Sequence, residues 1–206
     1  MSEKPELSDF ELDALRETAN IGTGSASIAL SALVGQKVTI DVPKTSVVPV
    51  RQVGDRISRA DEPVIGIYSS LQKGMSGNIL FVLPQTSAFA LMGQLKNRDE
   101  GIAHLGKEEM ELLKKLGSVV CSAYLAGLAK LFEQRIEFRT PNIVSTVGRS
   151  IVDFMLVQIA DDEEVLLISV AFNTETPRID GTFTLLFTLS TLAPLLEKLR
   201  RKMGMA

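Results

Sequence analysis

The sequence predicts an α/β (α+β) domain in which one unit of helix, strands, hairpin and helix occurs twice. Two observations support this: the order of the element patterns repeats, and apolar positions of the two halves coincide when one half is shifted along the other. The copies cover approximately residues 8–95 and 106–204, and residues 96–105 link them. The linker is short and each copy is small for a core of its own, so we expect a single domain over residues 1–206. The copies should pair about a pseudo-twofold axis, with a shared, mainly antiparallel sheet and the two long helices packed on it.

The first long helix is expected from Asp9 to Val34. Ser8 and Glu11 have the S-x-x-E spacing of a capping box, which satisfies free amide groups at a helix start. Gly35 follows the last periodic residue and can adopt the left-handed conformation that commonly ends a helix. The sequence therefore marks both ends of this helix.

This helix has an apolar side and a polar side. The apolar side is a stripe at helical spacing that consists of Leu15, Ala19, Gly22, Ala26, Ala29, Leu30 and Leu33. The opposite side contains, at spacings of four, three and four residues, Asp13, Glu17, Asn20 and Gly24. A glycine inside a helix costs about 1 kcal/mol relative to alanine, so we expect Gly22 and Gly24 to permit close packing of another helix.

The remainder of the first copy has the pattern of a small sheet followed by a helix. Alternating apolar residues predict one or two strands within residues 37–50, interrupted at Pro43 and Pro49. The elements expected next are a polar loop at 51–63, a hairpin from 64–72 and 77–84, and a helix at 85–95.

The second copy follows the same order. Its expected elements are a helix at 108–132, strand-like segments at 136–147 and 150–160, a hairpin from 164–173 and 181–189, and a helix ending near Lys202. A shift of 98 residues places Leu15 on Leu113 and Pro43 on Pro141, and a shift of 104 places 77–83 on 181–187. We therefore expect both long helices to present the same packing face.

Composition excludes several classes of function. The net charge is −3, and the 22 basic and 25 acidic residues are mixed along the chain, so we expect neither nucleic acid nor an anionic membrane as a partner. No apolar run reaches the roughly 18 residues of a membrane span. One cysteine, Cys121, excludes an intrachain disulfide and fits a reducing compartment, so we expect the cytoplasm. With one histidine, His104, and no metal-ligand spacing, we expect no metal site.

The polar side of the first helix resembles a known family motif. Asp13, Glu17, Asn20 and Pro43 form the pattern D-x3-E-x2-N-x22-P, and the run NIGTGSA begins at the asparagine. This pattern is similar to that of the CheC family of chemotaxis phosphatases, in which it commonly occurs twice. The resemblance spans nearly all of the chain, because that family is itself a duplicated helix–sheet unit.

The resemblance implies hydrolysis of the aspartyl phosphate on a CheY-type response regulator. Asn20 would orient the attacking water, and Glu17 would pair with the regulator's active-site lysine. Asp13 and Pro43 are assigned supporting, partner-binding roles, although Pro43 also suits a strand terminator. The resemblance implies no cofactor of the chain's own, because the regulator would supply Mg²⁺, and it implies CheD as a further partner.

The second copy departs from the pattern. At a shift of 98 residues, Asp13, Glu17 and Asn20 are replaced by Glu111, Lys115 and Ser118. Lys115 would repel the regulator's lysine, and Ser118 is too short to reach as an asparagine does. We therefore expect one working centre and one silent surface.

A second interpretation is a non-catalytic module of the same fold that binds a response regulator, CheD or a flagellar switch component. The two interpretations differ in one observable. An enzyme accelerates loss of the regulator's phosphate in a saturable way, whereas a binding module associates with the regulator without accelerating hydrolysis.

Overall fold

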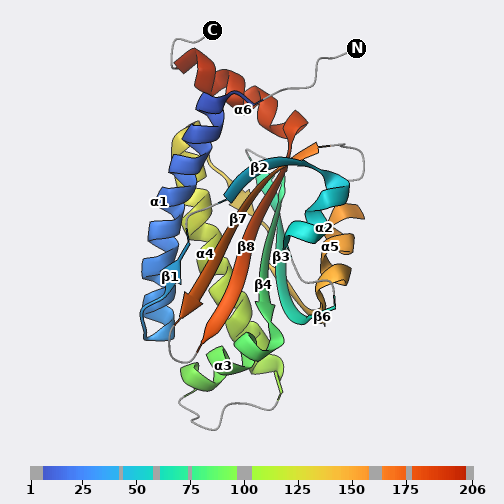
Figure 1. Cartoon of the computed structure of the whole chain (residues 1–206). Coiled ribbons are helices and arrows are strands. Elements are labelled where there is room, and N and C mark those ends of the chain that lie inside the picture. Colours follow the sequence, from blue (N-terminus) through green and yellow to red (C-terminus); the bar gives the residue numbers. More distant parts are fainter. Residues whose placement is uncertain are drawn as a thin grey trace.

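The computed structural model describes residues 7–41, 44–57, 61–73, 76–96, 104–157, 164–174 and 178–202. One eight-stranded sheet separates two layers of helices (Figure 1). The long helices α1 (Asp9–Val34) and α4 (Lys107–Phe132) cover one face, and the short helices α2 (Val53–Ile57) and α5 (Gly148–Val157) lie on the other. At opposite ends of the molecule lie α3 (Gln85–Leu95) and α6 (Leu189–Lys202), and the 3-10 turn η1 (Val50–Gln52) precedes α2 (Figure 1).

The sheet combines strands from both halves of the chain in antiparallel pairs. Its strands are β1 (Thr39–Ile40), β2 (Lys44–Pro49), β3 (Pro63–Lys73), β4 (Asn78–Pro84), β5 (Glu137–Phe138), β6 (Asn142–Val147), β7 (Glu164–Thr174) and β8 (Ile179–Thr188). They follow the order β1-β7-β8-β4-β3-β5, with β2 also paired to β7 and β6 also paired to β3. The first strands of each half therefore pair with the hairpin of the other half. This confirms one shared antiparallel sheet, whereas the sequence duplication itself stays a prediction.

Strand β4 shows why the central strands are apolar along their whole length. Ile79, Phe81 and Leu83 belong to the core cluster that contains the long helices. Leu80 and Val82 alternate with them and belong to the cluster under α2 and α5. Because helices cover both faces of the sheet, a continuous apolar run replaces the alternation expected of a half-exposed strand.

Helix α1 begins and ends where the sequence predicts. The Ser8 backbone amide donates to Glu11 Oε2 at 2.8 Å, and the Glu11 amide donates to Ser8 Oγ at 3.3 Å, which completes the capping box. Gly35 has φ 72° and ends the helix in the left-handed conformation.

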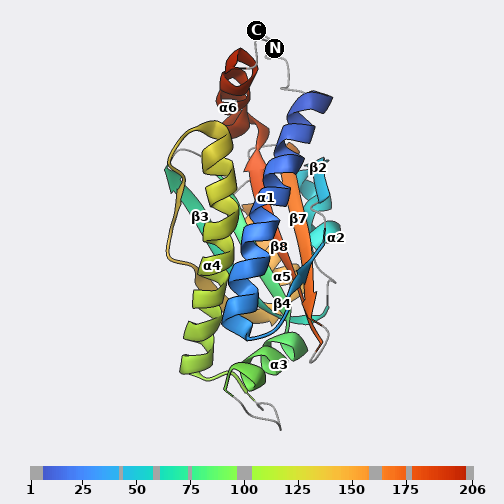
Figure 2. The ribbon, with the colours of Figure 1, turned by 90° about the vertical axis from the view of Figure 1, so that its left-hand side faces the viewer.

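The two long helices pack against each other in antiparallel directions (Figure 2). Gly22 allows this approach, because a Cβ there would lie 3.0 Å from Tyr124 Cδ1 and 3.2 Å from Tyr124 Cα. On the facing helix, a Cβ at Gly127 would lie 3.1 Å from the Thr18 carbonyl oxygen. The Tyr124 hydroxyl and Thr23 Oγ1 are 2.5 Å apart and share a hydrogen bond across the contact. The expected packing role of Gly22 is therefore confirmed.

Gly24 has no such role, and the expectation that it permits helix packing is wrong. A Cβ at this position would meet no atom within 4 Å, and the residue is exposed on the outer side of α1. The reason is geometric: two residues along a helix correspond to a turn of about 200°, so Gly22 and Gly24 lie on different sides.

Three further expectations are corrected by the structure. The segment 150–160 was expected as a strand, but its described part belongs to helix α5, whose buried Ile151, Val152 and Met155 face the sheet at helical spacing. A short apolar run fits a strand or a helix equally well, so tertiary packing determines which of the two forms. The loop expected at 51–63 contains η1 and α2. Leu33, expected in the packing stripe of α1, is 42% exposed.

Helix α4 has the length and composition of a membrane span, contrary to the expectation that no segment reaches it. Its apolar side is nevertheless covered by the rest of the chain. Its buried residues are Leu113, Leu116, Gly117, Val120, Cys121, Tyr124, Leu125, Gly127, Leu128 and Phe132. The helix also has charged residues at both ends, so its apolar character is that of a core helix.

The different surroundings of the two glycines predict different responses to the same substitution. Gly22→Val should lower the free energy of unfolding by about 1–3 kcal/mol, because the side chain overlaps the Tyr124 backbone. Gly24→Val should change it by less than about 0.5 kcal/mol, because valine is at least as good a helix former as glycine and meets no neighbour. Urea unfolding of both variants tests this, and equal losses would contradict the packing described for α1 and α4.

Candidate functional site

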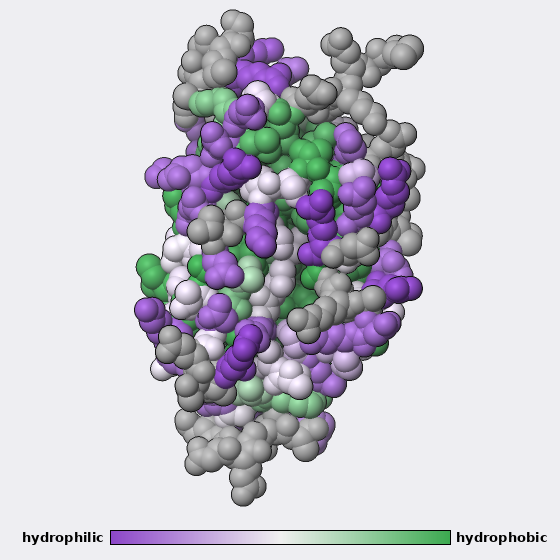
Figure 3. Space-filling view, in the orientation of Figure 1, coloured by the Kyte–Doolittle hydropathy of each residue, from purple (hydrophilic) through white to green (hydrophobic). Residues whose placement is uncertain are grey.

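The polar side of α1 faces solvent. Asp13, Glu17, Asn20 and Gly24 are all exposed, and together they form a stripe that begins in the second turn of the helix. Figure 3 shows hydrophilic side chains along the edge of the molecule where α1 lies, with apolar groups between them. The site is therefore a convex ridge. Because such a surface does not enclose a substrate, chemistry there requires a partner that presents its own reactive group.

Glu17 and Asn20 differ from Asp13 in their availability. Asp13 Oδ1 accepts a hydrogen bond from Arg16 Nη1 at 3.1 Å, which makes an exposed ion pair within the helix. Within the described part of the chain, no hydrogen bond or ion pair engages the Glu17 carboxylate or the Asn20 amide. The three-residue spacing places these two side chains one turn apart on the same side. A carboxylate and an amide are thus free to bind another molecule together.

The N-terminal end of α1 is attached to the last helix of the chain. Glu11 is fully buried, and its Oε2 accepts hydrogen bonds from Ser8 and, at 2.9 Å, from Arg200 Nη2 of α6. Burial by itself would raise the pKa of the Glu11 carboxyl, but the hydrogen bonds from Arg200 and Ser8 outweigh it, so the pKa is lowered. Glu11 therefore stays ionised and connects the two helices.

The middle and the C-terminal end of α1 are also attached. The Thr23–Tyr124 hydrogen bond joins its centre to α4. At its end, Gln94 Nε2 of α3 donates to the Val34 carbonyl at 3.0 Å, and Ser27 Oγ donates to the Val38 carbonyl at 2.7 Å. A helix attached at three places presents its outer side chains in a fixed orientation, which a binding site requires.

The corresponding surface of α4 differs in its chemistry. Glu111 pairs with Lys114 at 3.0 Å, and Lys115 is exposed. The Ser118 side chain is half-buried, and its Oγ donates to the carbonyl of Lys114 at 2.9 Å. The Ser118 hydroxyl is therefore bonded within its own helix, in contrast to the free amide of Asn20. Pro43, the last residue of the motif, lies outside the described residues.

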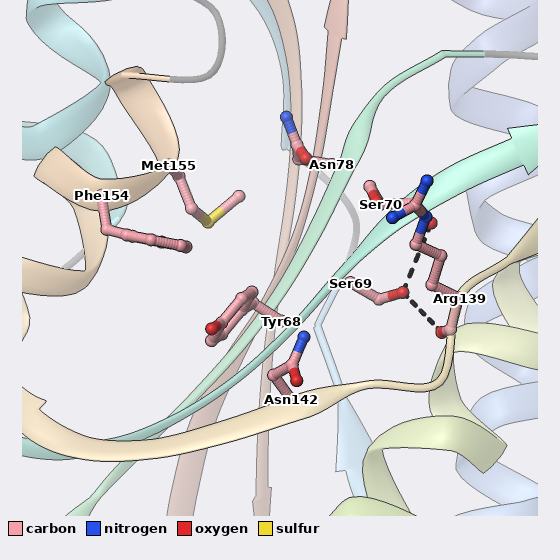
Figure 4. Close-up of a pocket in the computed structure, with 8 residues that line it drawn as sticks. All are labelled: Tyr68, Ser69, Ser70, Asn78, Arg139, Asn142, Phe154 and Met155. Atoms are coloured by element: carbon pink, nitrogen blue, oxygen red, sulfur yellow. Dashed lines mark hydrogen bonds between the residues drawn. The ribbon is translucent and has the colours of Figure 1, made fainter.

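A pocket that the sequence did not predict lies on the α5 side of the sheet (Figure 4). Its volume is about 210 Å³, and it is lined by Tyr68, Ser69, Ser70, Asn78, Arg139, Asn142, Phe154 and Met155. Tyr68 and Phe154 form one wall, with their rings edge to face at 5.1 Å. Ser69 Oγ donates to the Arg139 carbonyl at 2.7 Å and holds the chain at the opposite wall. The pocket depends on the pairing of β3 with β6, which are far apart in sequence.

A second pocket, of about 360 Å³, lies where β2 pairs with β7 and is lined partly by Asp41, Lys44 and Arg56.

In the described ranges, no group of three or more His, Cys, Asp or Glu side chains could hold a metal ion. Burial raises the pKa of the Cys121 thiol to about 12, so this thiol is protonated and a poor nucleophile. The free polar groups of α1 therefore remain the candidate site.

Comparison with known proteins finds relatives of the segment that contains this site. Residues 10–47, which contain Asp13, Glu17 and Asn20, match the model of the CheC-like family. Over 140 residues, the chain is 28% identical to the CheY-P phosphatase CheC of Bacillus subtilis (strain 168), a match that covers 66% of this chain and 67% of CheC. It is also 28% identical over 207 residues to the flagellar motor switch phosphatase FliY of the same organism. That match covers 96% of this chain and 51% of FliY, so the chain spans about half the length of FliY.

Solved structures share the whole fold. FliY from Thermotoga maritima superposes with a TM-score of 0.76 at 15% identity, covering 96% of this chain and all of that one. The middle domain of FliM from Vibrio alginolyticus superposes with a TM-score of 0.65 at 12% identity, covering 90% of this chain and 99% of that one. The chain therefore shares its fold with FliY and with the middle domain of FliM.

Residues 10–47 thus match the CheC-like family model, and the chain is homologous to the CheC and FliY phosphatases. The resemblance inferred from the motif of the first helix is thereby confirmed.

The attachment of α1 to α6 predicts a pH-dependent contribution to stability. Because the pKa of Glu11 is lower in the folded chain than its ordinary 4.5, its ion pair stabilises the fold above about pH 4.5 and is lost as the pH falls through the lowered pKa. Arg200→Gln should reduce the free energy of unfolding near pH 7 by about 1–3 kcal/mol, because it leaves a buried carboxylate without its charged donor. The same substitution should matter less at acidic pH.

Arg201→Gln is the matched control. Arg201 is exposed and lies 3.8 Å from Glu197, so its loss should cost less than about 0.5 kcal/mol at either pH. Urea unfolding of both variants at two pH values provides the test. Equal losses for the two substitutions would show that Glu11 does not depend on Arg200.

Proposed function

We propose that this protein is a phosphatase that hydrolyses the aspartyl phosphate of a CheY-type response regulator. The observation on which the proposal rests is the exposed, unbonded Asn20 amide one helical turn from the free Glu17 carboxylate. Of its homologues, CheC is named as a CheY-P phosphatase and FliY as a flagellar motor switch phosphatase, which supports the same class of substrate. Because α1 is convex, the side chains would act by entering the active site of the regulator.

The chemistry requires little from the phosphatase itself. An aspartyl phosphate is an activated acyl phosphate, and its hydrolysis needs chiefly a water held in line with the phosphorus–oxygen bond that breaks. A side-chain amide can both accept a hydrogen bond from such a water and donate one to the phosphoryl oxygens. Asn20 can therefore orient the water without acting as a strong base. The proposal assigns the Mg²⁺ that this chemistry uses to the regulator.

Glu17 has an electrostatic role in the proposal. Its carboxylate would pair with the lysine of the regulator's active site, which fixes the register of α1 against the partner. Asp13, one turn earlier, adds negative charge at the edge of the same surface while it remains paired with Arg16. One centre per chain is proposed, because the corresponding Ser118 hydroxyl is bonded within α4 and Lys115 has the opposite charge to Glu17.

A second candidate function is binding without catalysis: the protein would be a module that binds the regulator or a flagellar switch component. Either function would operate in the cytoplasm. The observation that favours it is the close fit of the fold to the FliM middle domain. Saturation of the phosphate-release rate with phosphorylated regulator supports the enzyme. Association with the regulator at an unchanged rate of phosphate loss supports the module.

The catalytic role of Asn20 predicts unequal effects at the two corresponding positions. Asn20→Ala should reduce the acceleration of dephosphorylation by about 100-fold or more, because the attacking water loses its orienting group. Ser118→Ala, the matched control on α4, should leave it within about twofold. The measurement is phosphate release from the phosphorylated regulator, with unfolding curves for both variants. A comparable loss in Ser118→Ala would refute the single centre.

The charge of Glu17 predicts an effect on KM. Glu17→Lys should raise KM for the phosphorylated regulator by about tenfold or more, because it places a cation against the regulator's lysine. Glu17→Gln removes the attraction without adding repulsion and should raise KM less. The wild-type KM should increase with salt, and this dependence should weaken in Glu17→Gln. An unchanged KM in both variants would show that Glu17 lies outside the interface.

A further inference from the structure

Two exposed isoleucines flank a glycine on the outer side of α1. Ile21 is 50% exposed and Ile28 is 75% exposed. With Gly24 they have the spacing i, i+3 and i+7, so Gly24 lies between them on one side of the helix. A Cβ at Gly24 would meet no atom within 4 Å. Ile21, Gly24 and Ile28 therefore form a notch, called here the α1 notch, in which two apolar side chains border bare backbone.

The fold of this chain does not account for the α1 notch. Glycine is a poor helix former, and Gly22 compensates for this through its close contact with Tyr124. Gly24 has no corresponding contact among the described residues. Ile28 likewise leaves three quarters of a large apolar side chain in solvent. A side chain from another molecule would find both the space over Gly24 and the apolar walls.

The corresponding surface of α4 has no such notch. At a shift of 98 residues the equivalents are the half-buried Val119 and the exposed Ser122 and Ala126. Ser122 fills the glycine position with a hydroxyl that donates to the Ser118 carbonyl at 2.8 Å. The notch therefore occurs on α1 beside Glu17 and Asn20 and is absent from α4, which has Lys115 and Ser118 at the corresponding positions.

The α1 notch is continuous with the proposed site. Ile21 directly follows Asn20, and Gly24 is one turn from Asn20 on the polar side of the helix. A molecule that brings its reactive group to Asn20 would thus cover Gly24 at the same time. This continuity identifies the occupant by its chemistry: the phosphorylated domain on which Asn20 acts.

We propose that the α1 notch is the docking site for the receiver domain of the response regulator and accepts an apolar side chain beside the phosphorylated aspartate. This inference rests on the proposed function, because the regulator is the partner that it assumes. An ion pair between exposed side chains, such as the one proposed between Glu17 and the receiver's lysine, contributes little affinity, whereas buried apolar contacts contribute much of it. In this arrangement the notch supplies affinity. Glu17 fixes the register of α1 against the receiver domain, and Asn20 orients the attacking water.

The test uses two substitutions that alter the notch in different ways. Gly24→Met fills it, and Ile28→Gln removes one apolar wall. The ligand is a CheY-type receiver domain from the organism that encodes this protein, activated with beryllofluoride. Each substitution should raise the Kd for this domain by about tenfold or more, measured by titration calorimetry. Each should raise KM for the phosphorylated domain similarly and leave kcat within about twofold. Neither should lower the urea midpoint, since both positions are exposed.

Matched controls lie outside the notch. Ser122→Met places the same side chain at the corresponding position of α4, and Leu33→Gln removes an exposed apolar side chain elsewhere on α1. Both should leave Kd and KM within about twofold. Equal losses in the controls would overturn the inference, because they would show a general effect of surface composition.

The outcomes separate this inference from the proposed activity. If the wild type accelerates hydrolysis and both notch variants keep its Kd and KM, the phosphatase stands and the docking notch is refuted. If the wild type binds the receiver domain through the notch without accelerating hydrolysis, the docking site stands and the catalytic role of Asn20 is refuted. A wild type that neither binds nor accelerates overturns both.

Discussion

The contact between α1 and α4 determines which side of α1 meets solvent. Gly22 and Gly127 let the two backbones approach, and the Thr23–Tyr124 hydrogen bond fixes their relative rotation. Tyr124 in turn stacks on Phe183 of β8 with ring centroids 4.5 Å apart, so the contact continues into the sheet. If α1 turned by one residue, its glycine would leave the contact. The outward position of Asn20 is therefore a consequence of core packing.

The exchange of strands between the halves explains how the exposed side of a long helix can change while its packing side is retained. Because β1 and β2 pair with β7, and β5 and β6 pair with β3, each half completes the sheet of the other. Packing residues in both long helices are therefore constrained by the same core. Exposed positions such as Lys115 and Ser118 are free of that constraint, so the polar side of α4 can differ from that of α1 without loss of the fold.

Local patterns predicted those parts of the structure that local interactions determine. The ends of α1 follow from its capping box and from Gly35, and the β3–β4 and β7–β8 hairpins follow from apolar runs separated by turns. Helix α5 was misassigned because a short apolar run fits a strand or a helix equally well. The strand exchange and the pocket at Tyr68 depend on contacts between distant segments. A packing role was expected for both Gly22 and Gly24, although they lie on different sides of α1, and in the structure only Gly22 faces Tyr124.

The proposed function requires the Asn20 amide of α1 to enter the active site of a phosphorylated receiver domain. The most direct measurement is a crystal structure of the complex with a beryllofluoride-activated receiver domain. We expect the Asn20 side chain to lie within hydrogen-bond reach, about 3 Å, of the beryllofluoride group or of a water bound to it, with Glu17 beside the receiver's lysine. A receiver domain seated on α4 or α5, with Asn20 left in solvent, would contradict the proposed function.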